Sequence, residues 1–162
     1  MKTYLLFLVL LAQFNYGQDA LSDLLKRYNK ESVPYITVDQ LQEKQDAMII
    51  LDSREPNEYK TSHIKNAVYV GYRDFSTENL KRLNIPKDAT LVVYCSLGIR
   101  SENVAEKIQQ LGYKNVFNLY GGIFEWKNKN CPVVNGLNKP TDSIHTYSKK
   151  WSKWLHNGIK VY

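Results

Sequence analysis

The stretch Leu91-Val92-Val93-Tyr94-Cys95-Ser96-Leu97-Gly98-Ile99-Arg100 places a cysteine between a predicted strand and a predicted helix. Residues 91–94 are apolar and β-branched, as in a buried strand, and residues 101–111 have helical spacing up to Gly112. Backbone N–H groups of a short loop and of a helix N-terminus stabilise negative charge, so a thiol placed there loses its proton easily. We therefore expect Cys95 to be a reactive thiolate. The alternative is an inert cysteine of the buried core.

Short apolar runs alternate with helical patterns along the rest of the chain. Strands are predicted at residues 48–51, 68–70, 91–94 and 115–119, after an extended piece at 35–37, and helices at 38–44, 78–83, 101–111 and 123–128. This alternation predicts an α/β fold with a largely parallel sheet. Asp52, Cys95 and Gly121 all follow predicted strand ends. Because ligands bind at the carboxyl ends of such strands, we expect these three residues to lie near one site.

Composition excludes several other classes of protein. Most of the net charge of +6 lies after Gly136, where five lysines (139, 149, 150, 153 and 160) outnumber Asp142. The remainder is nearly neutral, so no nucleic-acid partner is expected. Two cysteines far apart in the sequence form neither a disulfide framework nor a metal-ligand cluster. No metal and no cofactor are therefore expected.

The N-terminus resembles a secretory signal. Lys2 precedes an apolar run over residues 4–12, and Gly17 is a small residue suited to cleavage before Gln18. The run is shorter than the ~20 residues that span a bilayer and fits the ~7–15 residues of a signal core. We expect a signal peptide at 1–17 and an exported protein, periplasmic or secreted; a buried N-terminal helix is the alternative. Residues 18–33 are predicted to form a helical extension.

Four sequence blocks, in order, resemble the rhodanese-homology (sulfurtransferase) family. They are Asp52-Ser53-Arg54-Glu55 with Glu58-Tyr59, His63-Ile64 with Asn66-Ala67, Cys95 to Arg100 with Ser101, and Gly121-Gly122-Ile123 with Trp126 and Pro132. Ser62 replaces the glycine that usually precedes the histidine of the second block. The resemblance implies a rhodanese domain at residues 34–135, with an open parallel sheet of about five strands flanked by helices.

The resemblance also implies roles for individual residues. Cys95 would be the catalytic nucleophile with Arg100 as its catalytic partner, and Ser96, Leu97, Gly98, Ile99 and Ser101 would surround the transferred sulfur. Arg100 either pairs with an acid such as Glu55 or Glu58 and braces the loop, or assists electrostatically, and the two roles can coexist. Asp52, Arg54 and Gly121 are supporting residues, and we interpret the first two as a structural charge network. His63 is interpreted as a structural hydrogen-bonding residue.

The length of the loop bears on the reaction. Related phosphatases and arsenate reductases carry one residue more between the cysteine and the arginine, which widens the loop for phosphate or arsenate. The shorter loop here favours a single sulfur atom and hence a persulfide on Cys95. Ser96 and Leu97 are uncharged, which weakens attraction of anionic thiosulfate and leaves a small-molecule or protein persulfide as an alternative donor.

We therefore expect a monomeric sulfurtransferase that passes sulfur from a small-molecule donor to a thiol or cyanide. The alternatives are a rhodanese-like sulfur carrier or partner-binding module without turnover and, less favoured, a phosphatase or arsenate reductase. A thiosulfate or persulfide donor needs no cofactor in this scheme.

Two features lie at or beyond the end of the predicted domain. Cys131 is interpreted as a structural thiol rather than a resolving cysteine. In the basic aromatic tail, residues 136–162, Ile144, Tyr147, Trp151 and Trp154 recur at intervals of three and four. This spacing predicts a helix that packs on the domain, or alternatively a surface helix that contacts a partner or an anionic membrane.

Overall fold

The computed structural model describes residues 20–162, and the predicted signal peptide lies outside them. The chain divides into two units, Met1–Glu31 and Ser32–Tyr162. In the first unit, residues 20–28 are helical, in agreement with the helical pattern of that segment. Within the described part, no helix is both long enough and apolar enough to cross a membrane.

The second unit alternates strands and helices before it ends in short strands. Its elements are β1 (Tyr35–Ile36), α2 (Val38–Lys44), the 3₁₀ turn η1 (Gln45–Ala47), β2 (Ile49–Asp52), α3 (Pro56–Thr61), β3 (Val68–Tyr69), α4 (Thr77–Arg82), β4 (Thr90–Tyr94), α5 (Arg100–Gln110), β5 (Asn115–Leu119), α6 (Gly122–Asn128), β6 (Val133–Val134), β7 (Pro140–Thr141), β8 (Ser143–His145), the 3₁₀ turn η2 (Ser152–Trp154) and β9 (Ile159–Val161).

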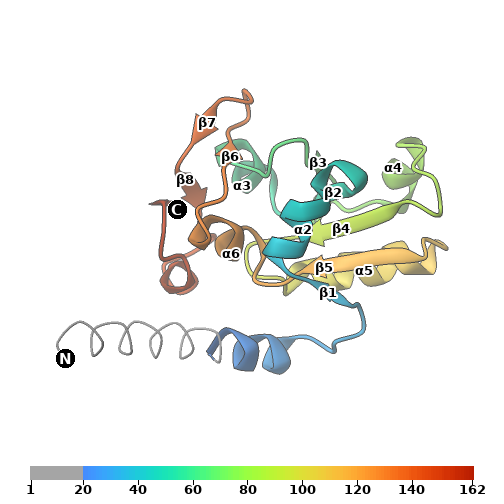
Figure 1. Ribbon diagram of the computed structural model, residues 1–162, viewed down its shortest axis with the longest axis horizontal. Coiled ribbons are helices and arrows are strands. Elements are labelled where there is room, and N and C mark those ends of the chain that lie inside the picture. Colours follow the sequence, from blue (N-terminus) through green and yellow to red (C-terminus); the bar gives the residue numbers. More distant parts are fainter. Residues whose placement is uncertain (1–19) are drawn as a thin grey trace. The chain divides into compact units, whose positions relative to one another are not determined.

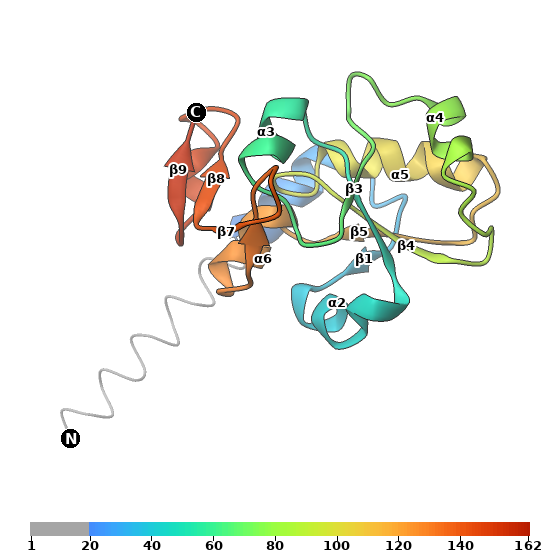
Figure 2. The ribbon, with the colours of Figure 1, turned by 90° about the horizontal axis from the view of Figure 1, so that it is seen from above.

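The first five strands form one sheet in the order β1-β5-β4-β2-β3, with every neighbouring pair parallel. The predicted five-stranded parallel α/β sheet is confirmed. Figures 1 and 2 show α4 and α5 on one side of this sheet and α2 on the other. β4 lies in the middle of the sheet, so the residue that follows it, Cys95, emerges at the centre of the carboxyl edge.

Local chemistry explains these elements. Residues 91–94 of β4 are fully buried, because a central parallel strand is covered on both faces. The faces of α5 and β4 share a core in which Val104, Ala105 and Ile108 recur at helical spacing. Thr37 caps α2: its hydroxyl accepts the Gln40 backbone N–H, and the Gln40 side chain accepts the Thr37 N–H.

The C-terminal tail is not the helix that its spacing predicted. Ile144 lies in β8, which pairs in parallel with β9, and the aromatic residues that follow occupy turns. Burial along the segment alternates instead: Ile144 and Thr146 are buried, whereas His145 and Tyr147 are more exposed. This period of two belongs to a strand, and the strand forms because it pairs in parallel with β9, sixteen residues later in the chain.

Candidate active site

Cys95 lies at the base of a tight loop between β4 and α5, and only 2% of the residue is exposed. The Gly98 backbone N–H donates to the Cys95 sulfur at 3.2 Å. The single hydroxyl proton of Ser101 has two acceptors in reach, the Cys95 sulfur at 3.5 Å and the Asn118 side-chain oxygen at 2.7 Å. The loop therefore directs the Gly98 N–H at the sulfur, where it would stabilise a negative charge.

The electrostatics of the loop favour the thiolate form of Cys95. Burial alone would raise the pKa of the thiol, since a buried charge loses its hydration. The positive charge of Arg100, the Ser101 hydroxyl and the backbone N–H groups of Ser101 and Leu97 act in the opposite direction and outweigh it. As a result, the pKa of Cys95 lies below its ordinary value, which makes the thiolate available as a nucleophile.

Glycine and asparagine hold the shape of the loop. Gly98 has a φ of 99°, a conformation that L side chains rarely adopt, and its carbonyl accepts a 2.7 Å hydrogen bond from the Asn118 side-chain amide. Asn118 is fully buried in β5 and bridges Gly98 to Ser101. We did not single out Asn118 from the sequence. Its signal is an uncharged polar residue between the apolar residues Phe117 and Leu119 of β5.

A second glycine turn approaches the loop from β5. Gly121 adopts a left-handed conformation, with a φ of 72°, at the start of α6. Next to it, Gly122 lies so close that a Cβ atom would overlap the Cys95 carbonyl and the Ser96 backbone. The Ile123 N–H donates to that carbonyl at 2.9 Å. Gly122, the neighbour of the predicted supporting residue Gly121, therefore lies directly against the Cys95 loop.

Arg100, the first residue of α5, forms a two-pronged ion pair with Glu58 of α3. Its two terminal nitrogens donate to the two carboxylate oxygens at 2.7 Å each. Ser96 joins the pair: its hydroxyl donates to Glu58 at 2.9 Å and accepts from Arg100 at 3.0 Å. The Glu58 side chain is 1% exposed and that of Arg100 17%. The cluster braces the loop, which is one of the two roles considered for Arg100.

Glu58 remains ionised at this buried position. Burial favours its neutral form, but the hydrogen bonds and charge of Arg100, the charge of Arg54 and the Glu55 backbone N–H together favour the carboxylate. The pKa of Glu58 is therefore held below its ordinary value. The sequence named Glu58 as a candidate partner of Arg100, and the structure selects it over Glu55, which lies 3.5 Å from Arg73 instead.

Asp52 and Arg54 form a separate buried network. Arg54 donates two hydrogen bonds to Asp52 from its side chain at 3.0 and 2.6 Å, and it also donates to the Ser62 carbonyl. The Tyr94 hydroxyl donates to the same carboxylate at 2.5 Å. All of these side chains are fully buried. The network joins the ends of β2 and β4 to the segment after α3, which is consistent with the structural interpretation of this pair.

The remaining predicted residues lie around the loop. Leu97 is buried, whereas Ile99 is half-buried. The His63 ring stacks on Tyr59 at 4.0 Å between ring centroids, and its backbone pairs with Val134, so its contacts are those of a structural residue. Two tyrosine rings, Tyr72 and Tyr147, lie 5.9 and 4.9 Å from the guanidinium carbon of Arg100. Neither ring was anticipated from the sequence.

Cys131 lies away from the loop chemistry. Both cysteines are free, and Cys131 is 1% exposed. Burial raises the pKa of the Cys131 thiol, so it is a poorer nucleophile than Cys95. Among residues 20–162, no group of three or more His, Cys, Asp and Glu side chains is arranged to hold a metal ion.

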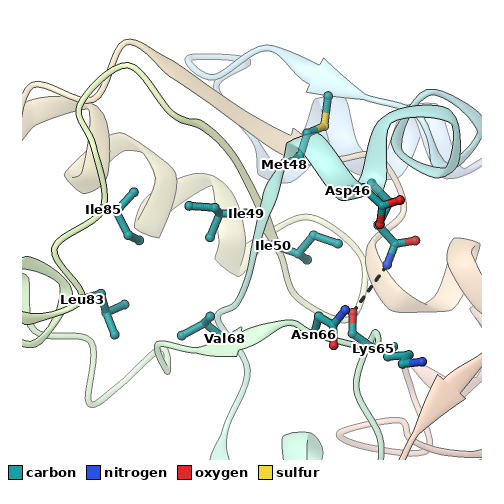
Figure 3. A pocket seen from close by; sticks show the side chains of 10 residues that line it. Asp46, Met48, Ile49, Ile50, Lys65, Asn66, Val68, Leu83 and Ile85 are labelled. Carbon is teal, nitrogen blue, oxygen red and sulfur yellow. Dashed lines mark hydrogen bonds between the residues drawn. The ribbon is translucent and has the colours of Figure 1, made fainter.

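A hollow of about 480 Å³ is lined by residues at the start of β2 (Figure 3). Cys95 instead follows the carboxyl end of β4. Aliphatic side chains such as Ile49, Val68 and Ile85 line it, with Asp46 and Lys65 among its polar groups. None of its lining residues is a cysteine, histidine or arginine. It therefore has a basic group, Lys65, but lacks the cysteine nucleophile of the Cys95 loop.

Fold and site together define an α/β protein in which a cysteine of lowered pKa follows the central strand of a parallel sheet. The family model of the rhodanese-like domain matches residues 36–129. This match covers more than half of the chain, and the chain belongs to the rhodanese-like domain family.

Related proteins carry different names. The thiosulfate sulfurtransferase GlpE of Coxiella burnetii is 30% identical over 97 residues, which are 60% of this chain and 87% of that protein. A tRNA uridine(34) hydroxylase of Yersinia enterocolitica is 32% identical over 100 residues, 59% of this chain and 29% of that protein. An uncharacterized protein of Synechocystis sp. is 34% identical over 104 residues, and the chain spans only 56% of its length.

Among solved structures, a rhodanese-related protein of Thermoplasma volcanium is similar, with a TM-score of 0.55 and 31% sequence identity. The similarity covers 62% of this chain and 97% of that protein. The shared fold and the shared family support sulfur-transfer chemistry as the class, while the names of the relatives differ in their reactions.

Proposed function

We propose that this protein is a sulfurtransferase that carries sulfane sulfur as a persulfide on Cys95. The observation that supports it most is the convergence on one sulfur atom of the Gly98 N–H, the backbone N–H groups of Leu97 and Ser101 and the charge of Arg100. Such an arrangement stabilises a thiolate and, equally, the anion of a persulfide. A thiol stabilised in this way needs no separate general base.

In the first step, the Cys95 thiolate attacks the outer sulfur of a donor. A new S–S bond forms between Cys95 and that sulfur, and the bond that held the sulfur in the donor breaks. The leaving group departs with the bonding electron pair, as sulfite from thiosulfate or as a thiolate from an organic persulfide. The charge moves to the terminal sulfur, where the loop N–H groups can hold it.

In the second step, an acceptor removes the terminal sulfur. An acceptor thiolate or cyanide attacks that atom, the Cys95–sulfur bond breaks, and the Cys95 thiolate is regenerated. The acceptor leaves as a persulfide or as thiocyanate. No net oxidation or reduction occurs, so the cycle requires neither a metal nor a redox cofactor.

The charges at the Cys95 loop affect which sulfur donor the protein would prefer. Arg100 is the basic side chain within residues 95–100, and its guanidinium is engaged by the Glu58 carboxylate. This pairing offsets most of its attraction for a dianion such as thiosulfate. We therefore propose an organic persulfide as the preferred donor and thiosulfate as a weaker one.

Mass spectrometry of the intact protein tests the proposal. Treatment with a cysteine persulfide or with thiosulfate should add about 32 Da, removable by cyanide, to the wild type and not to Cys95→Ser. Cys131→Ser, the matched control, should gain the same mass. A wild-type protein that gains no sulfur, or a Cys95→Ser protein that gains as much, would exclude this mechanism.

The non-turnover carrier is the second candidate, since the family includes members with other names and an intact Cys95 does not prove turnover. Steady-state assays with both donors, each with a thiol and with cyanide, separate the two. Repeated turnover supports the enzyme, whereas a persulfide that forms once and is never discharged supports the carrier.

A further inference from the structure

The C-terminal segment, residues 136–162, reaches the Cys95 loop although it lies outside the part of the chain that matches the family. The match ends at residue 129, yet β8 packs against α3, the helix that carries Glu58. Tyr147 is the second residue after β8, and its ring lies 4.9 Å from the guanidinium carbon of Arg100. The segment therefore contributes a side chain to the surroundings of the proposed site.

The segment is anchored firmly enough to place that ring. Ile144 and Leu155 are fully buried, and buried Lys127 of α6 forms an ion pair with Asp142. The Asn128 side chain, also of α6, donates to the Trp154 carbonyl and accepts the His156 N–H. Tyr147 is thus presented from a docked scaffold that is tied to α6.

The backbone of Tyr147 is strained. Its φ is 63°, in the left-handed region where a bulky aromatic residue is a genuine outlier. The Ser148 N–H donates to the Thr146 carbonyl at 2.7 Å, which closes a three-residue turn with Tyr147 at its centre. The Tyr147 N–H donates to the half-buried ring of His145 at 3.1 Å. A glycine would occupy this turn with less strain, so the turn itself does not explain the tyrosine side chain.

Tyr147 is 46% exposed, so its ring leaves apolar surface in contact with water, which is unfavourable. The Tyr147 ring forms a cation–π contact with Arg100. The Arg100 side chain lies between Glu58 and two tyrosine rings and is 17% exposed. A cation over the face of an aromatic ring is attracted to it, and the ring keeps water from that side of the charge.

We propose that Tyr147 is a positioning residue of the Cys95 site: its ring holds the Arg100 guanidinium beside the loop and shields it from water. This inference rests on the proposed role of Cys95 as the nucleophile. Glu58 sets the position of Arg100 through two hydrogen bonds, and Tyr147 adds a contact from the opposite end of the chain. Because Arg100 favours the Cys95 thiolate, loosening or hydrating the guanidinium should make the thiolate less favourable.

The test measures the rate at which iodoacetamide alkylates Cys95 as a function of pH, in a Cys131→Ser background that leaves one thiol. The groups that act on Cys95 are Arg100 and, through it, Glu58 of α3, while His145 contacts the Tyr147 backbone. Removing the ring with Tyr147→Gly should raise the midpoint of the pH profile by about half a pH unit. This shift corresponds to a decrease of about threefold in the acid dissociation constant of Cys95. Tyr147→Phe should keep the wild-type midpoint.

Glycine is the informative replacement because it relieves the backbone strain. We expect the thermal midpoint of Tyr147→Gly to be unchanged or higher, so that a shifted pH profile cannot be ascribed to unfolding. All of these variants keep the backbone N–H that donates to His145, so this contact is the same in each of them. Tyr162→Ala, an exposed tyrosine of the same segment, is the matched control and should leave the profile unchanged.

The possible outcomes separate this inference from the proposed function. Equal midpoints for the wild type and Tyr147→Gly would overturn the positioning role, and so would a Phe variant that shifts as far as Gly. Alkylation does not require sulfur transfer. A shifted midpoint in a protein that forms no persulfide would therefore reject the proposed function alone, whereas persulfide formation with equal midpoints would reject the role of Tyr147 alone.

Discussion

Single residues set the charge balance of the site. Glu58 and Arg100 form a buried ion pair, and breaking such a pair is more costly than its net contribution suggests because one charge is left without its partner. The pKa of Glu58 in the folded protein is below its ordinary value. The contribution of this group to folding stability is therefore fully present above the unfolded-state pKa of about 4.3 and is lost as the pH falls through the lower folded-state value.

We predict that Glu58→Gln lowers the free energy of unfolding by about 3 kcal/mol at pH 7. The difference from the wild type should shrink as the pH falls from 5 toward 3, because only the wild type loses the carboxylate contribution. Denaturant unfolding at several pH values measures both effects. The more exposed pair Lys129–Asp39 gives the control: Asp39→Asn should cost less than about 1 kcal/mol. A Glu58→Gln penalty that is equally small would contradict the bracing role.

At the scale of elements, the glycine turn between β5 and α6 and the Cys95 loop are built together. Gly122 is in a left-handed conformation, and a Cβ atom there would meet the Cys95 carbonyl. Two N–H groups from the start of α6 bond to the Cys95 and Ser96 carbonyls. The helix therefore closes one side of the loop, and its first residue must have no side chain.

We predict that Gly122→Ala destabilises the protein by about 3 kcal/mol or more and slows Cys95 alkylation. The cost combines left-handed strain of about 1–2 kcal/mol with overpacking of about 1–3 kcal/mol. Gly112→Ala is the matched control, since Gly112 has a φ of 88° and nothing lies within 4 Å of an added Cβ. The Gly112→Ala variant should lose only the stability that corresponds to the backbone strain, and its Cys95 should be alkylated at the wild-type rate. Equal penalties for the two variants would show that the close approach at Gly122 is unimportant.

At the scale of the whole molecule, the C-terminal segment belongs to the same folded unit as the sheet. Ile144 and Leu155 are fully buried, and burial of an aliphatic side chain of this size contributes about 1.5–3 kcal/mol. Deleting residues 139–162 should therefore lower the thermal midpoint by about 10 °C or more. Circular dichroism or calorimetry of the truncated protein measures this change. An unchanged midpoint would mean that the segment does not stabilise the domain.

A pair of isoleucines in the paired strands β8 and β9 refines this experiment. Ile144 is fully buried, whereas Ile159 is 62% exposed. Ile144→Ala should cost about 2–5 kcal/mol, and Ile159→Ala should stay within about 0.5 kcal/mol of the wild type. Similar losses for both would indicate that strand propensity, not packing on the domain, is what the segment contributes.

The amino-acid sequence by itself determined the order and type of the elements that build the sheet. The apolar run ending at Tyr94, the helical spacing after the loop and the Thr37 cap are all patterns within a few residues of the chain. Hydrophobic periodicity and capping chemistry report such contacts directly. The Cys95 loop could be predicted from the sequence for the same reason, because it consists of a strand, a short turn and a helix that are contiguous in the chain.

Only the tertiary structure decided which distant residues meet at the loop. The choice of Glu58 as the partner of Arg100, the bridge made by Asn118 and the ring of Tyr147 join segments that are far apart in sequence. The tail shows the same limit, because its three- and four-residue spacing suggested a helix, yet β8 and β9 pair with each other. Local patterns record what neighbours along the chain prefer, whereas strand pairing and buried ion pairs gain their free energy from partners that only folding brings together.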